Sequence, residues 1–263
     1  PSQSSAASDV YKRQRLASAL SKAGNIERLM TQEPGQIPLL MRSEDLATWD
    51  NWLSRPETAA LERLLRSQVP EHSAYVWGGA GMGKSHILQA CCGAEGLDAR
   101  YIPLRDLIDF APEQVLADAE FARLIAIDDI DCVESRAGWQ EALFALVNAS
   151  RETGAQLLVT ADKAPQQLLK ALPDLRSRLS SLPVFQMPRF TEEHIAELLA
   201  LRGVEAGIEL SADVARYCAL RLPRHPRAVV GFINQLDKLS LAQRRAVTIP
   251  FVRESGLLRQ AEG

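Results

Sequence analysis

Residues 74–85, Ala-Tyr-Val-Trp-Gly-Gly-Ala-Gly-Met-Gly-Lys-Ser, place a short apolar run directly before a glycine-rich turn that ends in Lys-Ser. The apolar run predicts a strand, and the residues after Lys84 predict a helix. G-x4-G-K-S between a strand and a helix is the spacing of a phosphate-binding P-loop. Glycines let the backbone turn its N–H groups toward phosphate oxygens, and the helix N-terminus adds a favourable dipole.

We therefore predict a nucleotide site in which Lys84 neutralises the β- and γ-phosphates and the Ser85 hydroxyl binds Mg²⁺. The alternative is a glycine-rich turn that binds nothing. The residues expected to contact the nucleotide in this loop are Gly78, Gly79, Ala80, Gly81, Met82, Gly83, Lys84 and Ser85.

A second apolar run, at 124–127, ends in the acid pair Asp128-Asp129. A strand that ends in an acid places a carboxylate at the carboxyl edge of the sheet, beside the P-loop. Asp128 is expected to hold Mg²⁺ directly or through water. Asp129 is expected to act as a general base on an attacking water. The alternative is two exposed acids that follow a core strand.

A third apolar run, at 157–159, ends in Thr160-Ala161-Asp162. If this strand lies next to the P-loop strand, Thr160 or Asp162 could contact the γ-phosphate or its water. We assign Asp162 to the nucleotide site, although strands often end in Thr and Asp simply to form a turn.

The chain as a whole alternates apolar runs with helical patterns up to about residue 189, which is typical of a parallel sheet flanked by helices. After that the pattern is entirely helical, so we expect an α/β base at 46–189 and a small helical lid at 190–263. The strands are expected at 74–77, 99–102, 124–128, 156–160 and 184–186. The helices are expected at 84–94, 112–117, 139–152, 165–171, 191–201, 211–222, 224–239 and 250–258.

Residues 1–29 differ from the rest, since 1–14 are polar and aperiodic and a normal protein start follows at Met30. We interpret 1–29 as a disordered or non-native leader, with a short amphipathic helix at 16–29 as the alternative. Residues 30–45 then form an N-terminal peptide before the base.

Composition narrows the class of protein. With 46% hydrophobic residues, 24% charged residues and a net charge of −3, the chain is globular and is not expected to grip duplex DNA directly. Four cysteines without a zinc spacing indicate reduced thiols. No apolar run is long enough for a membrane span, and no signal-peptide core is present, so we predict a cytoplasmic protein.

Taken together, these motifs resemble the AAA+ module of the bacterial replication initiator DnaA. The resemblance is carried by the P-loop with Ser85-His86, by Ile127-Asp128-Asp129-Ile130 and by Val159-Thr160-Ala161-Asp162. Thr48-Trp49-Asp50-Asn51-Trp52 resembles the aromatic motif that lines the adenine pocket in that family. Core packing is the alternative role for Trp49 and Trp52, and the two roles are compatible. The resemblance implies an AAA+ fold with ADP or ATP and Mg²⁺ as ligands.

A narrower resemblance is to the Hda family, which inactivates the initiator. The sequence ends at Gly263 after the lid, without a helix-turn-helix block or a basic tail, and the stretches 234–240 and 246–252 look much like the end of that family. In this resemblance Arg178, in Leu-Pro-Asp-Leu-Arg-Ser-Arg-Leu at 172–179, takes the role of an arginine finger that acts on a neighbour's nucleotide. Arg176 is solvated or supporting.

Two further sites follow from the same resemblance. Arg227, in Arg-His-Pro-Arg at 224–227, matches the second sensor arginine of the lid, which reaches toward the phosphates. The peptide Gln-Ile-Pro-Leu-Leu-Met at 36–41 looks like the short motif that docks on the DNA polymerase sliding clamp, with a buried glutamine and apolar anchors. The residues expected to contact the clamp are Gln36, Ile37, Leu39 and Met41.

The leading hypothesis is a negative regulator of chromosomal replication initiation that binds the clamp and stimulates ATP hydrolysis by DnaA. DNA contact would be indirect, and a homodimer is compatible with a finger that acts in trans. Whether the chain itself hydrolyses ATP stays open, because Lys84 and the acid pair are intact. The alternatives are an autonomous AAA+ ATPase of the helicase-loader type and a small-molecule P-loop kinase, which the lid arginine disfavours.

Overall fold

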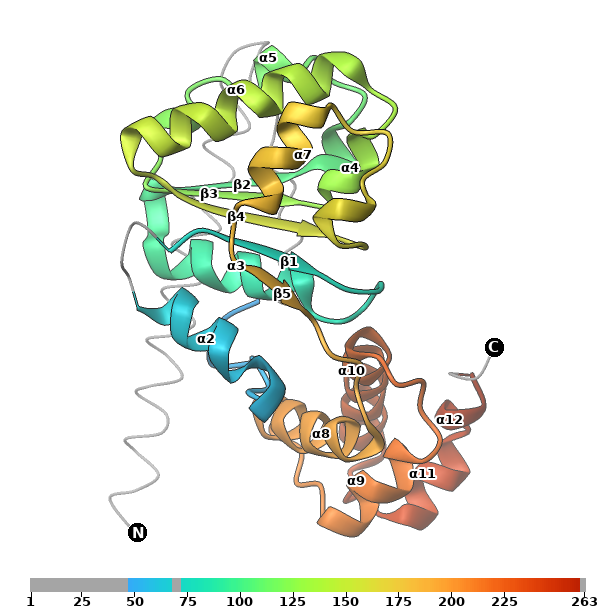
Figure 1. The fold of residues 1–263 in the computed structure, drawn as a ribbon. Coiled ribbons are helices and arrows are strands. Elements are labelled where there is room, and N and C mark those ends of the chain that lie inside the picture. Colours follow the sequence, from blue (N-terminus) through green and yellow to red (C-terminus); the bar gives the residue numbers. More distant parts are fainter. Residues whose placement is uncertain (1–46, 68–71, 261–263) are drawn as a thin grey trace, which may run out of the picture. The chain divides into compact units, whose positions relative to one another are not determined.

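The computed structural model describes residues 47–67 and 72–260. Within them the chain forms a parallel sheet in the order β2-β3-β4-β1-β5 (Figure 1). The predicted leader at 1–29 and the predicted clamp peptide at 36–41 lie outside the described residues. The strands are β1 (Ala74–Trp77), β2 (Ala99–Pro103), β3 (Leu124–Asp128), β4 (Gln156–Ala161) and β5 (Val184–Gln186).

All five predicted strands are confirmed, with β2 and β4 each one residue longer than expected. Every residue of β3 and β4 is buried, including the polar Asp128 and Thr160. Burial on both faces explains why these strands are continuous apolar runs in the sequence. Helix α3 (Lys84–Glu95) covers one face of the sheet and α6 (Ala137–Thr153) covers the other (Figure 1).

The helices of the base follow the sequence less closely than the strands do. Helix α3 begins at Lys84 as predicted, but the helix expected at 165–171 is wrong. Only the 3-10 helix η5 (Pro165–Gln167) forms there, because Leu168 leaves the helical region with a ψ of 67°. Helix α7 (Pro173–Ser180), which carries Arg178, was not expected. The other elements are η1 (Pro56–Thr58), α2 (Ala59–Arg66), η2 (Gly96–Asp98), α4 (Leu104–Leu107), α5 (Pro112–Val115), η3 (Ala119–Phe121) and η4 (Ile130–Val133).

After β5 the described chain is helical, as expected, and its helices begin at side-chain caps. Thr191, Ser211, His225 and Thr248 each accept a hydrogen bond from a backbone N–H in the first turn of the following helix. The helix expected at 250–258 is divided in two by Gly256, which has a φ of +70°. The lid helices are α8 (Glu192–Ala206), α9 (Ala212–Ala219), α10 (Pro226–Gln243), α11 (Ile249–Ser255) and α12 (Leu257–Gln260).

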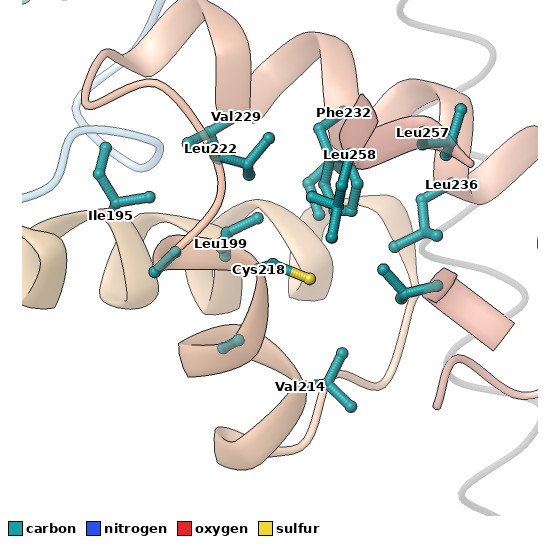
Figure 2. Close-up of a cluster of buried hydrophobic side chains, with 14 of the residues drawn as sticks. Ile195, Leu199, Val214, Cys218, Leu222, Val229, Phe232, Leu236, Leu257 and Leu258 are labelled. Carbon is teal, nitrogen blue, oxygen red and sulfur yellow. The ribbon is translucent and has the colours of Figure 1, made fainter. Parts of the chain in front are cut away.

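The lid has a hydrophobic core of its own. Figure 2 shows side chains from α8, α9, α10 and α12 that point toward one another, with Cys218 among them. Burial raises the pKa of Cys218 to about 12, so this thiol is protonated at neutral pH and packs as a small apolar group. The labelled members of this core are Ile195, Leu199, Val214, Cys218, Leu222, Val229, Phe232, Leu236, Leu257 and Leu258.

One buried arginine joins the segment before α2 to the segment that leads into the lid. Arg55 donates from Nη1 to the carbonyl oxygen of Pro188 at 3.2 Å, and its guanidinium lies 4.1 Å from the ring centroid of Phe190. Burial lowers the pKa of Arg55, since the guanidinium has lost most of its water.

Among the described residues, no helix is both long and apolar enough to cross a membrane.

Candidate nucleotide-binding site

The sheet order brings the predicted site residues to one edge. Strand β4 lies between β1 and β3, and Trp77 at the end of β1 pairs with Ala161 at the end of β4. The backbone N–H of Gly78 donates to the carbonyl oxygen of Ala161 at 3.1 Å, which continues this pairing into the loop. The carboxyl ends of parallel strands meet at one edge, where α/β proteins bind their ligands.

The loop at 78–83 has the backbone conformation that its glycines predict. Gly81 and Gly83 have φ values of +75° and +92°, in the left-handed region that favours glycine. A Cβ on Gly83 would also lie 3.2 Å from the Trp52 ring, and one on Gly78 would lie 3.0 Å from the Cβ of Met187. Both backbone torsion and close packing therefore require glycine here.

The Lys84 side chain folds back over the loop that precedes it. Its side chain is only 6% exposed, and its ammonium group donates to the carbonyl oxygens of Gly78 at 2.6 Å and Gly79 at 3.1 Å. The third partner is Oδ1 of Asp162 at 2.8 Å. All three N–H donors of the ammonium are thus used, and a phosphate oxygen could replace the carboxylate of Asp162.

Asp128 lies buried at the end of β3, and both of its carboxylate oxygens are hydrogen-bonded. Tyr101 donates its hydroxyl to Oδ2 at 2.7 Å, and the Thr160 hydroxyl donates to Oδ1. Burial, and then the charge of Asp128, raise the pKa of Tyr101, which keeps this phenol protonated as a donor. The hydroxyls of Tyr101 and Thr160 thus fix the orientation of the Asp128 carboxylate.

Asp129 begins the turn after β3 in the left-handed region, with a φ of +57°. Its backbone N–H donates to the Thr160 hydroxyl oxygen at 3.0 Å, so Thr160 connects the two acids. Its carboxylate pairs with Arg105, whose Nε lies 2.8 Å from Oδ2. Nη2 of Arg105 also lies 3.9 Å from Oδ2 of Asp162.

Sequence reasoning missed Tyr101 and Arg105. Tyr101 lies inside a predicted strand. Arg105 is the second residue after the end of that strand in the structure, whereas Asp129 and Asp162 directly follow theirs. A search for polar residues after every predicted strand would have included Arg105.

The residues also fit a bound Mg²⁺. Ser85 lies half-buried in the first turn of α3, and Asp128 ends β3, which is separated from the P-loop strand β1 by β4 alone. Hydroxyl and carboxylate oxygens are ligands that Mg²⁺ prefers, and phosphates and water usually complete its octahedron.

The aromatic motif at 48–52 packs in the core of the base. Trp52 is buried among apolar side chains that include Val76 and Ile87, and its ring lies 5.4 Å from that of His86 between centroids. Trp49 packs edge-on against Trp52 at 6.3 Å, and the guanidinium of Arg66 lies 4.2 Å from a Trp49 ring centroid. Both tryptophans therefore pack in the core. Trp52 also lies beside the loop, next to Gly83.

The two predicted functional arginines differ in their relation to the loop. Arg227 is exposed in the first turn of α10, two residues after His225, whose ring lies 3.3 Å from the Cβ position of Gly81. Arg178 is exposed on α7, and within the described part of the chain its guanidinium has no hydrogen bond or ion pair. The start of the Arg227 helix thus reaches the loop, whereas Arg178 is directed to solvent.

Two protein families match parts of the chain. Residues 192–255 match the lid domain of Hda, and residues 114–183 match the ATPase domain of bacterial DnaA. The first match covers α8 to α11, and the second includes β3, β4 and α7.

Solved structures share the fold. Domain III of the Thermotoga maritima replication initiation protein DnaA superposes with a TM-score of 0.67 at 24% identity, over 81% of this chain and 95% of that one. AMPPCP-bound DnaA from Aquifex aeolicus gives 0.61 at 18% identity, over 75% and 68%. The Thermotoga maritima RuvB Holliday junction branch migration motor gives 0.56 at 14% identity, over 80% and 71%.

The low identities mean that these structures establish the fold alone, and RuvB shows how widely that fold is shared. The two family matches are more specific, since they fall on the lid and on the half of the base that carries the acid pair. With its five-stranded sheet and its P-loop, the chain has a DnaA-like AAA+ fold, and its lid is similar to that of Hda.

Proposed function

We propose that the chain binds ADP or ATP with Mg²⁺ and acts as a negative regulator of replication initiation. The observation that carries this proposal is the combination, in one chain, of an Hda-type lid at 192–255 with a P-loop whose Lys84 is buried among loop carbonyls. The lid match favours the regulator, and the loop supplies the site for its nucleotide.

In this proposal the nucleotide phosphates lie along the loop at 78–85. Lys84 exchanges the Asp162 carboxylate for a phosphate oxygen, while Ser85 and Asp128 hold Mg²⁺. The AMPPCP-bound Aquifex aeolicus DnaA, which shares the fold, supports the proposal that this chain binds a nucleotide. Arg227 contacts the phosphates from the first turn of α10, whose cap residue His225 lies next to Gly81.

Arg178 acts on a partner's nucleotide in trans. It is exposed on α7, and the buried Leu175 and Leu179 anchor this helix to the base. A guanidinium with no partner among the described residues is free to approach an anion on another protein. Arginine fingers supplied in trans raise hydrolysis by about 10³–10⁵. The proposed target is the ATP of the initiator DnaA, which would lose activity on hydrolysis.

The same proposal includes a tether to the DNA polymerase sliding clamp through Gln36, Ile37, Leu39 and Met41, so that contact with DNA is indirect. The protein would work in the cytoplasm, and a homodimer would use the same head-to-tail contact as Arg178 makes with the initiator.

The decisive experiment mixes the purified protein with ATP-loaded DnaA and with clamp loaded on DNA, and follows hydrolysis of the ATP bound to DnaA. The wild type should accelerate it, and Arg178→Ala should abolish the acceleration. Arg176→Ala, two residues earlier on the same helix, is the matched control and should keep most of it. An Arg178→Ala protein as active as the wild type would refute the finger.

The tether has a separate test. Gln36→Ala should weaken binding to the isolated clamp by roughly tenfold, since it removes a buried anchor, and leave nucleotide affinity unchanged. Equal clamp affinity for both proteins would refute the tether without affecting the nucleotide site.

A second candidate, an autonomous ATPase of the helicase-loader type, is favoured by the ordered acids. Asp128, Thr160 and Asp129 form one hydrogen-bonded group beside the loop, as a hydrolytic site requires. Rapid ATP turnover by the chain alone, with no effect on DnaA, would favour this candidate over the regulator. We propose weak turnover at best.

A further inference from the structure

We propose that Gln140 is a positioning residue for Arg178, because its buried amide ties the start of helix α7 to the end of η4. The inference rests on the proposed function, in which Arg178 acts on a partner's nucleotide, and deepens it. Gln140 lies on α6, outside the nucleotide site, and is buried, so it acts through α7 and not by touching the partner.

The side-chain amide of Gln140 is hydrogen-bonded at both of its ends. Nε2 donates to the carbonyl oxygen of Val133, the last residue of η4, at 3.0 Å and to that of Glu134 at 2.8 Å. Oε1 accepts from the backbone N–H of Leu172 at 2.6 Å, and the carbonyl oxygen of Lys170 lies 3.4 Å from Nε2. The side chain is only 7% exposed, so water cannot readily replace these bonds.

Helix α7 depends on such outside contacts for its position. It has eight residues, and helices shorter than about 12 residues are marginal in isolation. Its N-cap residue is Leu172, whose side chain has no oxygen that could accept from the first turn. Leu175 and Leu179 bury the helix beside α6 (Figure 1), but apolar burial is not directional. Gln140 adds a directional contact at the point where the helix begins.

A second side chain holds the same segment. Oε1 of Glu134 accepts from the backbone N–H of Lys170 at 3.2 Å, while its Oε2 forms an ion pair with Lys163. Lys170 is thus bonded to Glu134 and Leu172 to Gln140. The backbone before α7 is therefore fixed at two points against the turn that follows the acid pair.

The place of Arg178 follows from the direction in which α7 leaves this segment. Arg178 is six residues after Leu172, which corresponds to about 9 Å along a helix. A tilt at Leu172 therefore moves the guanidinium. A misplacement of about 1 Å can cost roughly 10²-fold in rate. Loss of the Gln140 bonds should thus lower the rate of hydrolysis in the partner more than the affinity for the partner.

The test follows single-turnover hydrolysis of the ATP bound to DnaA, with clamp loaded on DNA, at increasing concentrations of the full chain. Gln140→Met keeps the length of the side chain and removes its hydrogen bonds. The maximal rate constant should fall about 10- to 100-fold, while the half-saturating concentration should stay within about threefold of the wild type. In the Arg178→Ala background the same change should cause no further loss, because its effect passes through Arg178.

Gln156→Met is the matched control. Gln156 is 8% exposed and donates to the carbonyl oxygen of His72 at 2.8 Å, at the amino end of β4. Loss of this bond should also lower the Tm, but it should leave the maximal rate constant unchanged. A role of Gln140 in stability alone predicts equal maximal rate constants for the two variants.

Amide hydrogen exchange, followed by NMR, measures the bond to α7 without DnaA. In Gln140→Met the N–H of Leu172 should exchange roughly tenfold faster than in the wild type. The N–H of Val159, inside the buried strand β4, should keep its wild-type rate.

Unchanged exchange at Leu172, or a full maximal rate constant in a folded Gln140→Met protein, would overturn the inference. A further loss in the Arg178→Ala background would do so too. If Gln140→Met does not fold, Glu134→Ala takes its place. It frees the same segment at Lys170 and should lower the maximal rate constant about threefold, and a full rate would overturn the inference.

Failure of the proposed function gives a different result. A wild type that does not accelerate hydrolysis by DnaA, or an Arg178→Ala protein as active as the wild type, would remove the finger and this inference with it. The faster exchange at Leu172 in Gln140→Met would persist in that case, because it depends on the fold of this chain alone.

Discussion

The ammonium nitrogen of Lys84 lies 2.8 Å from Oδ1 of Asp162, a residue 78 positions further along the chain. The pair forms because β4 lies beside β1, so the turn after β4 meets the loop after β1. An anion already faces the lysine that is expected to bind phosphate. The fold therefore already holds the Lys84 ammonium beside an anion, as a bound phosphate would require.

Lys84→Ala should weaken ATP and ADP binding about 10- to 100-fold, because hydrogen bonds to charged groups contribute roughly 1.5–3 kcal/mol. Titration calorimetry measures the change. Lys163→Ala is a matched control, since Lys163 pairs with Glu134 instead of the loop, and its affinity should equal that of the wild type. Equal affinity of Lys84→Ala and Lys163→Ala would contradict the P-loop assignment.

Thr160→Val should destabilise the protein by about 1–3 kcal/mol, although valine has nearly the same shape. The hydroxyl is fully buried, donates to Asp128 and accepts from the N–H of Asp129, so its loss leaves buried polar groups unpaired. Urea unfolding measures the free energy. For comparison, Thr153→Val, at an exposed site on α6, should stay within about 0.5 kcal/mol; similar values for both would show that the buried hydroxyl contributes little.

The parts of the site that sequence could predict are those that depend on local pattern. The Gly78–Ser85 loop, Asp128 and Asp162 each follow an apolar run, and such runs predict buried parallel strands. The helix expected at 165–171 was wrong because a proline at a first turn also begins a 3-10 turn, and the sequence alone does not say how far the helix continues.

Contacts between distant residues could not be predicted in this way. The Arg105–Asp129 pair depends on the register of β2 against β3, and the Lys84–Asp162 pair depends on the strand order. A shift of one residue would turn the side chains to the other face. Such pairs require the assembled sheet, which no local pattern encodes.

Gly83→Ala should destabilise the fold by about 1–3 kcal/mol and weaken nucleotide binding. Its φ of +92° disfavours any side chain, and the added Cβ would lie 3.2 Å from the Trp52 ring. Gly93→Ala, inside α3 with no atom within 4 Å of the new Cβ, should instead stabilise the protein by about 0.5–1 kcal/mol. Thermal unfolding measures the change in stability for each variant. If both variants were stabilised, the positive φ at Gly83 would not require glycine.

Glu62 should stabilise the fold at neutral pH and lose this contribution in acid. Its carboxylate accepts hydrogen bonds from the hydroxyls of Ser54 and Thr58, both at 2.6 Å. Burial acts to raise the pKa of Glu62, but these hydrogen bonds outweigh it and bring the pKa below the ordinary value of 4.5. A carboxyl whose pKa is lower in the folded state stabilises that state above the unfolded pKa, and the contribution disappears as pH falls through the folded pKa.

Glu62→Gln should therefore lower the free energy of unfolding by roughly 1.5–3 kcal/mol at pH 7, the range for hydrogen bonds to a charged group. The difference should shrink below pH 4.5, where the wild-type carboxyl takes up a proton and resembles the amide. Urea unfolding at pH 7, 5 and 3.5 measures it. Glu57→Gln, at a half-exposed side chain on the neighbouring turn, is the control for loss of a more exposed carboxylate at pH 7. If the Glu62→Gln deficit were the same at every pH, the ionised carboxylate would not be the stabilising form.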